Sequence, residues 1–141
     1  MNNFNAAGIA TVRVVLGVIM LAHGIQKFAV YTVAGFEGVL GEIGVPLAGL
    51  LSYVVPTVEV AAGALLILGL FTRIAGVLTL GVGLAALFTM HIGNGLFVDE
   101  GGYELVLLIA ASGAGLALIG GGRFSLDAVV PLGKKTVAQA A

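Results

Sequence analysis

The segment from Pro46 to Phe71 constrains the fold of this chain most strongly, because it is apolar over a membrane-spanning length and carries one carboxylate, Glu59, near its middle. An α-helix rises about 1.5 Å per residue, so about 20 residues cross a hydrocarbon layer of about 30 Å. The segment is therefore predicted to be a transmembrane helix. An ionisable group at that depth costs roughly 2.5 to 3.5 kcal/mol unless it faces protein groups or a hydrated cavity. Glu59 thus predicts a bundle of further helices around it.

The composition agrees with a membrane protein. Of the 141 residues, 60% are hydrophobic and 9% are charged, whereas soluble domains are typically about 25% charged. We therefore expect the lipid bilayer to be the main partner of the chain. The formal net charge of -1 gives no reason to expect nucleic acid as a partner. The chain has no cysteine, which excludes disulfides, thiol-ligated metals and thiol redox chemistry of its own.

Three further apolar segments accompany this one. Together the four predict an all-α fold, a polytopic transmembrane four-helix bundle that forms a single domain over residues 1–141. The spans are expected at about 7–28, 46–71, 74–92 and 103–119, with a tail at 122–141. Thr72 is a candidate N-cap for the third span, because it precedes the apolar run directly.

The segment between the first two spans, residues 30–45, is too short and too often interrupted by glycine to cross a membrane. Its apolar residues nevertheless recur at helix-like spacing. They are Phe36, Val39, Leu40 and Ile43. This pattern predicts a short interfacial segment that lies along the membrane surface.

The first span has a polar face of small residues. At about 100° per residue, its members fall within one narrow arc, with His23 at the edge. They are Arg13, Gly17, Met20, Gly24 and Lys27. Glycines allow helices to approach closely, and polar side chains can find partners on the helices opposite. This face is therefore predicted to pack inside the bundle.

The distribution of cations predicts the orientation. With four spans, one side of the membrane would hold both termini and most of the Lys and Arg residues: Arg13, Arg73, Arg123, Lys134 and Lys135. The other side would hold Lys27 with the acidic residues Glu37, Glu42, Asp99, Glu100 and Glu104. Lys and Arg near span ends favour the cytoplasm. Both termini are therefore expected in the cytoplasm of a bacterial cell, with the protein in the inner (plasma) membrane.

The same topology orders the polar residues by depth and leaves the partner of Glu59 open. His23 and Lys27 lie on the outer side of Glu59, and Arg13 lies on its inner side. A small shift in helix register would exchange these partners. The sequence therefore predicts an internal partner for Glu59 without deciding between them.

Several motifs, in order and at matching distances, resemble the DoxX family of small bacterial membrane proteins. They are Arg13-Val-Val-Leu-Gly17, His23-Gly24 with Lys27, Gly44-Val-Pro46, EVAAGALLILGLFTR from Glu59 to Arg73, and GRFSLD from Gly122 to Asp127. The resemblance covers about residues 13–127. It implies a four-helix membrane bundle and an association with redox complexes. DoxX-like proteins are often classed as oxidoreductases, one relative is the quinone-reducing membrane subunit of a thiosulfate-oxidising enzyme, and others dock soluble redox proteins.

Two functional hypotheses follow, with a third kept as an alternative. In the first, the chain is a quinone-linked oxidoreductase, or an accessory subunit of one, with quinone bound between its helices. Candidate proton-transferring residues are Glu59, His23 and Glu104, and candidate quinone-binding residues are Arg13, His23, Lys27, Glu59, Arg73 and His91. In the second, the bundle is a non-catalytic anchor that recruits a redox protein partner. The third is a small proton-coupled transporter. Each is compatible with a homo-oligomer.

Each candidate residue also has a purely structural interpretation. Arg13 and Lys27 can anchor the helix at an interface, and Arg73 can simply fix the topology at a tight turn. Glu59 can belong to an ion pair that sets helix register. His23 and His91 can hydrogen-bond to neighbouring helices, and nothing in their spacing with Glu104 requires a metal. Asp127 and the tail after it are interpreted as a solvated terminus.

Overall fold

Residues 2–130 are described by the computed structural model, and they form helices without any strand. The helices are α1 (Asn3–Ala29), α2 (Thr32–Glu42), α3 (Ala48–Leu68), α4 (Thr72–Ala86), α5 (Glu104–Ile119) and α6 (Leu126–Val129). The π-helix η1 (Leu87–His91) and the 3₁₀ turn η2 (Ile92–Asn94) prolong α4, and the 3₁₀ turn η3 (Val98–Glu100) precedes α5. The predicted all-α membrane bundle is confirmed. Lys134 and Lys135, on which the predicted orientation partly rests, lie outside the described residues.

Three helical segments are long and apolar enough to cross a membrane. They are α1, α3 and the continuous helix from Thr72 to Asn94. The fourth apolar helix, α5, has 16 residues and is shorter than the roughly 20 residues that a perpendicular span needs. The number of spans therefore stays a prediction. The segment between α1 and α3 contains the helix α2, which buries Phe36 and Leu40 and leaves Val39 exposed, and Ile43, directly after the helix, is exposed as well.

The helices pack as two close antiparallel pairs, α1 with α3 and α4 with α5. Glycines permit both contacts. A Cβ atom at Gly17 would lie 2.8 Å from the carbonyl oxygen of Gly63, and one at Gly76 would lie 2.7 Å from that of Gly113. Backbones that approach this closely gain extensive van der Waals contact, which is a main source of helix association where lipid removes the hydrophobic drive. The glycine-bearing face predicted for α1 is therefore its packing face.

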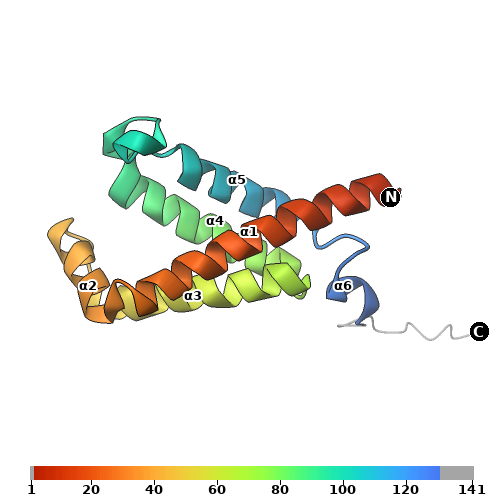
Figure 1. Ribbon diagram of the computed structural model, residues 1–141, viewed down its shortest axis with the longest axis horizontal. Coiled ribbons are helices and arrows are strands. Elements are labelled where there is room, and N and C mark those ends of the chain that lie inside the picture. The colour runs from red at the N-terminus through yellow and green to blue at the C-terminus, as the bar shows by residue number, and fades with distance from the viewer. Residues whose placement is uncertain (1, 131–141) are drawn as a thin grey trace, which may run out of the picture.

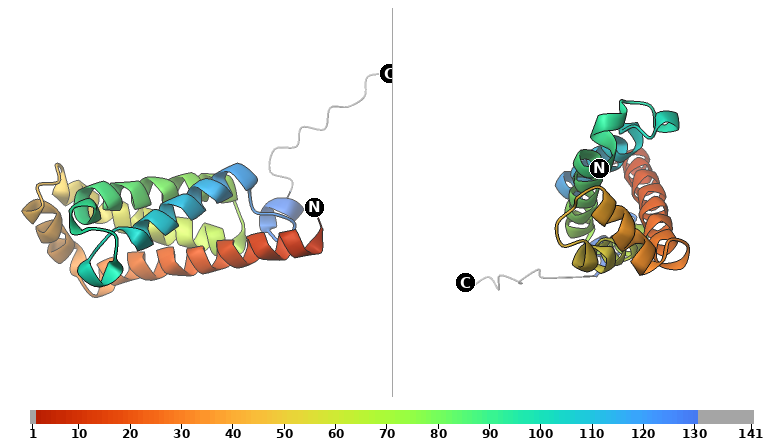
Figure 2. Two further views of the ribbon diagram at one scale, coloured as in Figure 1. Left: turned by 90° about the horizontal axis from the view of Figure 1, so that it is seen from above. Right: turned by 90° about the vertical axis from the view of Figure 1, so that its left-hand side faces the viewer.

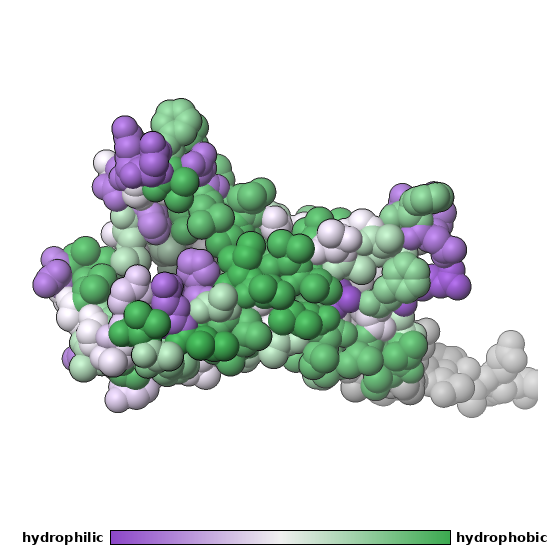
Figure 3. All heavy atoms as spheres, viewed as in Figure 1, coloured by the Kyte–Doolittle hydropathy of each residue, from purple (hydrophilic) through white to green (hydrophobic). Residues whose placement is uncertain are grey.

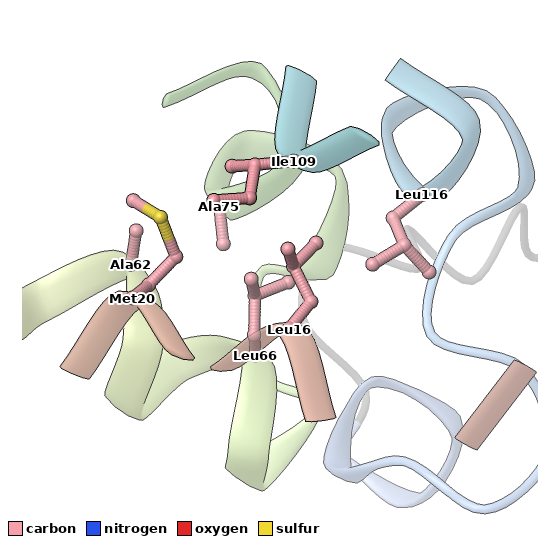
Figure 4. Packing of buried hydrophobic residues seen from close by; sticks show 7 residues of the cluster. All are labelled: Leu16, Met20, Ala62, Leu66, Ala75, Ile109 and Leu116. Carbon is pink, nitrogen blue, oxygen red and sulfur yellow. The ribbon is translucent and has the colours of Figure 1, made fainter. Parts of the chain in front are cut away.

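A cluster of buried apolar side chains joins the two pairs in the middle of the bundle (Figure 4). All four long helices contribute to it, and its members are Leu16, Met20, Ala62, Leu66, Ala75, Ile109 and Leu116. Outside this cluster, many large apolar side chains are exposed on the surface. Such a surface is unfavourable in water but suits contact with lipid chains.

The bundle has two different ends. At one end, which we call the α2 end, lie α2 and the turns between α4 and α5; at the other, the N-terminal end, lie the start of α1, the α3–α4 turn and α6 (Figure 1). The views from above and along the axis show the long helices running side by side between these ends (Figure 2). In Figure 1 the two helix pairs diverge toward the α2 end.

Candidate functional site

The partner of Glu59 is Lys27. The Nζ atom of Lys27 donates hydrogen bonds to both carboxylate oxygens of Glu59, each at 2.8 Å, so the ion pair joins α1 to α3. The side chain of Glu59 is 6% exposed and that of Lys27 is 16% exposed. Glu59 lies in the middle of α3, a helix of membrane-spanning length. An ion pair at this depth satisfies two groups that would each be costly alone.

Helix geometry explains why these two side chains meet. Gly24 packs against the backbone at Pro56 and Val60, which places the backbone of Lys27 about one helical turn nearer the α2 end than that of Glu59. Side chains on a helix tilt toward its N-terminus. Because α1 and α3 are antiparallel, Lys27 tilts away from the α2 end while Glu59 tilts toward it. The two tilts bridge the offset between the backbones.

The ion pair lies toward the α2 end of the bundle, beside partly exposed and aromatic side chains. His23 is one turn before Lys27 on α1 and is partly exposed. The buried ring of Phe36 on α2 lies beside the pair, with its centroid 5.5 Å from the Nζ atom of Lys27, a cation–π distance. Figure 3 shows a notch between the loop after α4 and the corner of α1 and α2, with hydrophilic surface at its base over the second half of α1.

Arg13 lies at the opposite end, where it caps α3. Its side chain is buried, and its guanidinium group donates hydrogen bonds to the carbonyls of Leu66 and Ile67 and to that of Phe124. The last carbonyls of a helix have no partner within the helix, and a cation there also opposes the negative end of the helix dipole. Arg13 thus fastens α1 to the end of α3 and to the segment before α6. It does not reach Glu59.

The sequence suggested that Asp127 belongs to a solvated terminus, and its side chain is indeed exposed, but it also caps α4. The tail from residue 131 to residue 141 lies outside the described residues. The carboxylate of Asp127 accepts hydrogen bonds from the backbone N–H groups of Phe71, at 2.7 Å, and Thr72, at 2.9 Å. Partial burial acts to raise the pKa of Asp127, but the hydrogen bonds from Thr72 and Phe71 and the charge of Arg13 outweigh it, and the pKa lies below its ordinary value. Thr72, the cap that the sequence suggested, is instead the first residue of α4, and its buried hydroxyl has no hydrogen-bond partner among the described residues.

The remaining predicted site residues lie elsewhere. The Nδ1 atom of His91 is 2.7 Å from the carbonyl oxygen of Gly101, and Glu104 accepts a hydrogen bond from the backbone N–H of Val98. Both side chains therefore order the loop between α4 and α5. Arg73 is exposed at the N-terminal end, beside Gly120. Within residues 2–130, no group of three His, Asp or Glu residues is placed to hold a metal ion.

Two features of the site were missing from the sequence interpretation. Phe36 was predicted on the apolar face of its segment, but its contact with Lys27 joins residues of different helices. The π-helix η1 at Leu87–His91 ends at His91 and places that side chain over the loop. Such single-turn π segments are frequent at functional sites, yet no residue in this stretch signals one.

The fold and the ion pair define the class of this chain: a helical membrane protein that buries a charged pair within an apolar bundle. The model of the DoxX family matches residues 8–92. This match covers more than half of the chain, and the protein belongs to the DoxX family, as its motifs suggested. No solved structure matches the chain.

Curated relatives give the membrane assignment further support. The chain is 33% identical over 138 residues to "Putative oxidoreductase CatD" of Bacillus subtilis, covering 96% of each protein. It is 33% identical over 125 residues to an uncharacterized protein of Haemophilus influenzae, covering 84% of this chain and 87% of that protein. Over 66 residues it is 38% identical to an uncharacterized membrane protein of Mycobacterium tuberculosis, covering 47% of this chain and 40% of that protein.

Proposed function

We propose that this protein is the integral membrane subunit of a redox system, and that the surroundings of the Lys27–Glu59 pair bind the head group of a quinone. The observation that carries the proposal is the ion pair itself, which places a donor and a proton acceptor together in the middle of a membrane-spanning helix. In this proposal the protein lies in a bacterial inner membrane with both termini in the cytoplasm.

The chemistry of a quinone fits these side chains. Its two carbonyl oxygens accept hydrogen bonds, and its reduction to the quinol takes up two electrons, which a redox partner protein would supply, and two protons. An ammonium group has three N–H donors. Among the described residues, Lys27 directs its hydrogen bonds to Glu59 alone, which leaves one donor for a carbonyl oxygen of the quinone.

Glu59 and His23 would handle the protons. A carboxylate paired with an ammonium group can accept a proton and return it, which is the role of a general acid–base group. His23 lies one turn from Lys27 toward the α2 end of the bundle, and histidine is a frequent general acid–base group. Lys27 would therefore orient the ligand, while Glu59 and His23 would exchange protons with it.

The relative from Bacillus subtilis supports a redox role through its name, "Putative oxidoreductase CatD", because it aligns with nearly the whole of this chain. A shared fold does not by itself imply a shared reaction. The site residues therefore have to be tested in this protein directly.

The test is the molar ratio of quinone to protein after gentle extraction from native membranes, measured by mass spectrometry of the organic extract. Glu59→Gln and His23→Ala should lose most of a near-stoichiometric quinone. Glu37→Gln, which alters an exposed carboxylate on α2, should retain it. A background level of quinone that is the same in all four proteins would contradict the proposal and favour a scaffold that recruits a redox partner.

A further inference from the structure

We propose that water and protons reach the Lys27–Glu59 pair only from the α2 end of the bundle, and that the route from the N-terminal end is closed. One-sided access would decide from which side of the membrane a quinone site takes up protons. In that respect the inference rests on the proposed function. The access itself can be measured without any quinone.

The apolar cluster closes the first part of the route toward the N-terminal end. Met20 and Leu16 lie on α1 one and two turns beyond His23, and both are almost completely buried. Ala62 and Leu66 continue the same layer on α3, and Figure 4 shows Leu16 beside Leu66 and Met20 beside Ala62. The buried hydroxyl of Thr79 in α4 donates to the carbonyl of Ala75 in its own helix. Water needs two to four polar partners to remain in such a layer.

The close contact of α1 and α3 leaves no space for water between these helices. A Cβ atom at Gly63 would lie 2.5 Å from the backbone nitrogen of Leu21 and 2.7 Å from the carbonyl oxygen of Gly17. Real Cβ atoms do not approach other atoms this closely, so the backbones themselves are in contact. This contact lies directly on the N-terminal side of Glu59, one turn along α3.

Arg13 seals the route a second time. Its guanidinium group is bound to the carbonyls of Leu66, Ile67 and Phe124, which fixes it across the end of α3. An arginine in proteins does not lose its proton, so Arg13 cannot pass a proton between the N-terminal end and Glu59. Arg13 instead holds the end of α3 and the segment that contains Phe124 together.

At the α2 end, in contrast to the N-terminal end, the polar side chains nearest to the ion pair are partly exposed. Lys27 and His23 are both partly exposed there, whereas Arg13 and the cluster are buried. The two helix pairs diverge at this end, and the notch of Figure 3 has hydrophilic surface at its base. The buried ring of Phe36, a residue of α2, lies beside Lys27 on this side of the pair. Protons taken up or released by the pair therefore come from the water beyond α2.

The absence of native cysteine makes the access measurable with single-cysteine variants. A charged, membrane-impermeant thiosulfonate reagent modifies thiolates, which form in water and hardly at all in lipid. Two exposed positions define the sides: Asp99→Cys for the α2 end and Asn5→Cys for the N-terminal end. Vesicles are treated from one side at a time, and unmodified thiols are then counted with a mass-tagged maleimide after denaturation.

His23→Cys should be modified from the side on which Asp99→Cys reacts, and at least about 10-fold more slowly from the side on which Asn5→Cys reacts. Met20→Cys, within the cluster, should resist the reagent from both sides. Lys27→Cys combined with Glu59→Gln gives a second probe that leaves no unpaired charge, and it should behave as His23→Cys does.

Modification of His23→Cys from the Asn5 side, or from neither side, would overturn the inference. Modification of Met20→Cys from the Asn5 side would also do so, because it would show water within the cluster. These outcomes can be told from failure of the proposed function. The quinone content is measured on the wild-type protein, because the labelled variants replace residues of the proposed quinone site. One-sided labelling together with a wild-type protein that holds no quinone would refute the quinone site alone. Two-sided labelling together with a wild-type protein that retains quinone would refute the one-sided access alone.

Discussion

Lys27 and Glu59 meet between α1 and α3 although their backbones lie about one helical turn apart along the bundle. The two side chains together span this offset, because each tilts toward the N-terminus of its own helix. The ion pair consequently reports the register of two antiparallel helices. It also brings the ammonium group of Lys27 to the same depth in the bundle as the carboxylate of Glu59.

Removing one partner of the Lys27–Glu59 pair should lower the stability of the protein strongly, whereas removing both partners should change it little. Glu59→Leu leaves the ammonium group of Lys27 without its partner and should destabilise the protein by about 3 kcal/mol. Lys27→Met combined with Glu59→Leu replaces both charges by apolar groups and should lie within about 1 kcal/mol of wild type. Thermal unfolding of all variants in one detergent measures the difference. Equal stability of Glu59→Leu and wild type would show that the pair does not hold the helices.

The glycine contact between α1 and α3 should tolerate no added methyl group. Gly63→Ala places a Cβ atom against the backbone of Leu21 and should cost about 2 kcal/mol, because the helices must separate. Gly81→Ala is the matched control: Gly81 lies within α4 and a Cβ atom there has open space around it. That change should stabilise the protein by about 0.5 kcal/mol through helix propensity. A stabilising effect of both changes would contradict the contact.

Arg13 should act through its donors to the end of α3 rather than through its charge alone. Arg13→Met leaves the carbonyls of Leu66, Ile67 and Phe124 without this donor and should cost about 3 kcal/mol. Arg13→Lys should recover only part of this loss, because a single ammonium group cannot reproduce the guanidinium fork. Arg123→Gln, at an exposed arginine of the same end, should change stability by less than about 1 kcal/mol. Chemical denaturation in mixed micelles separates these cases.

The cap that Asp127 provides to α4 should be sensitive to acid. Because the pKa of its carboxyl is lowered in the folded protein, its contribution is complete above the ordinary pKa of 3.8 and is lost as the pH falls through the lower folded value. Asp127→Ala should cost about 1 kcal/mol near neutral pH, and this difference from wild type should vanish in acid.

Asp127→Asn separates the cap from the charge. An asparagine does not titrate, and its single side-chain oxygen can replace only one of the two carboxylate oxygens that accept hydrogen bonds from Phe71 and Thr72. This variant should keep only part of the stability near neutral pH and should lack the acid-dependent part. The measurement is thermal unfolding from about pH 1 to about pH 7. A constant difference between wild type and Asp127→Ala across this range would disprove the role of the ionised carboxylate.

Part of the candidate site could be predicted from the sequence. Glu59 in an apolar segment required a partner, and the polar face of α1 identified the residues that could supply one. His23 and Lys27 do lie near Glu59, but Arg13, Arg73, His91 and Glu104 are at other places in the bundle. Helical periodicity assigns residues to a face of their own helix and to a depth. It does not state which residue of another helix lies opposite.

The sequence by itself determined the membrane class, the helical fold and the interior face of α1, because segment length, hydropathy and the period of the helix are local properties. Only the tertiary structure decided that Lys27 pairs with Glu59, that Arg13 caps α3 and that Asp127 caps α4. These contacts depend on how two helices slide along each other and on where a distant segment returns. Glycine contacts such as Gly17 with Gly63 fix that register, and their fit is a property of two surfaces together.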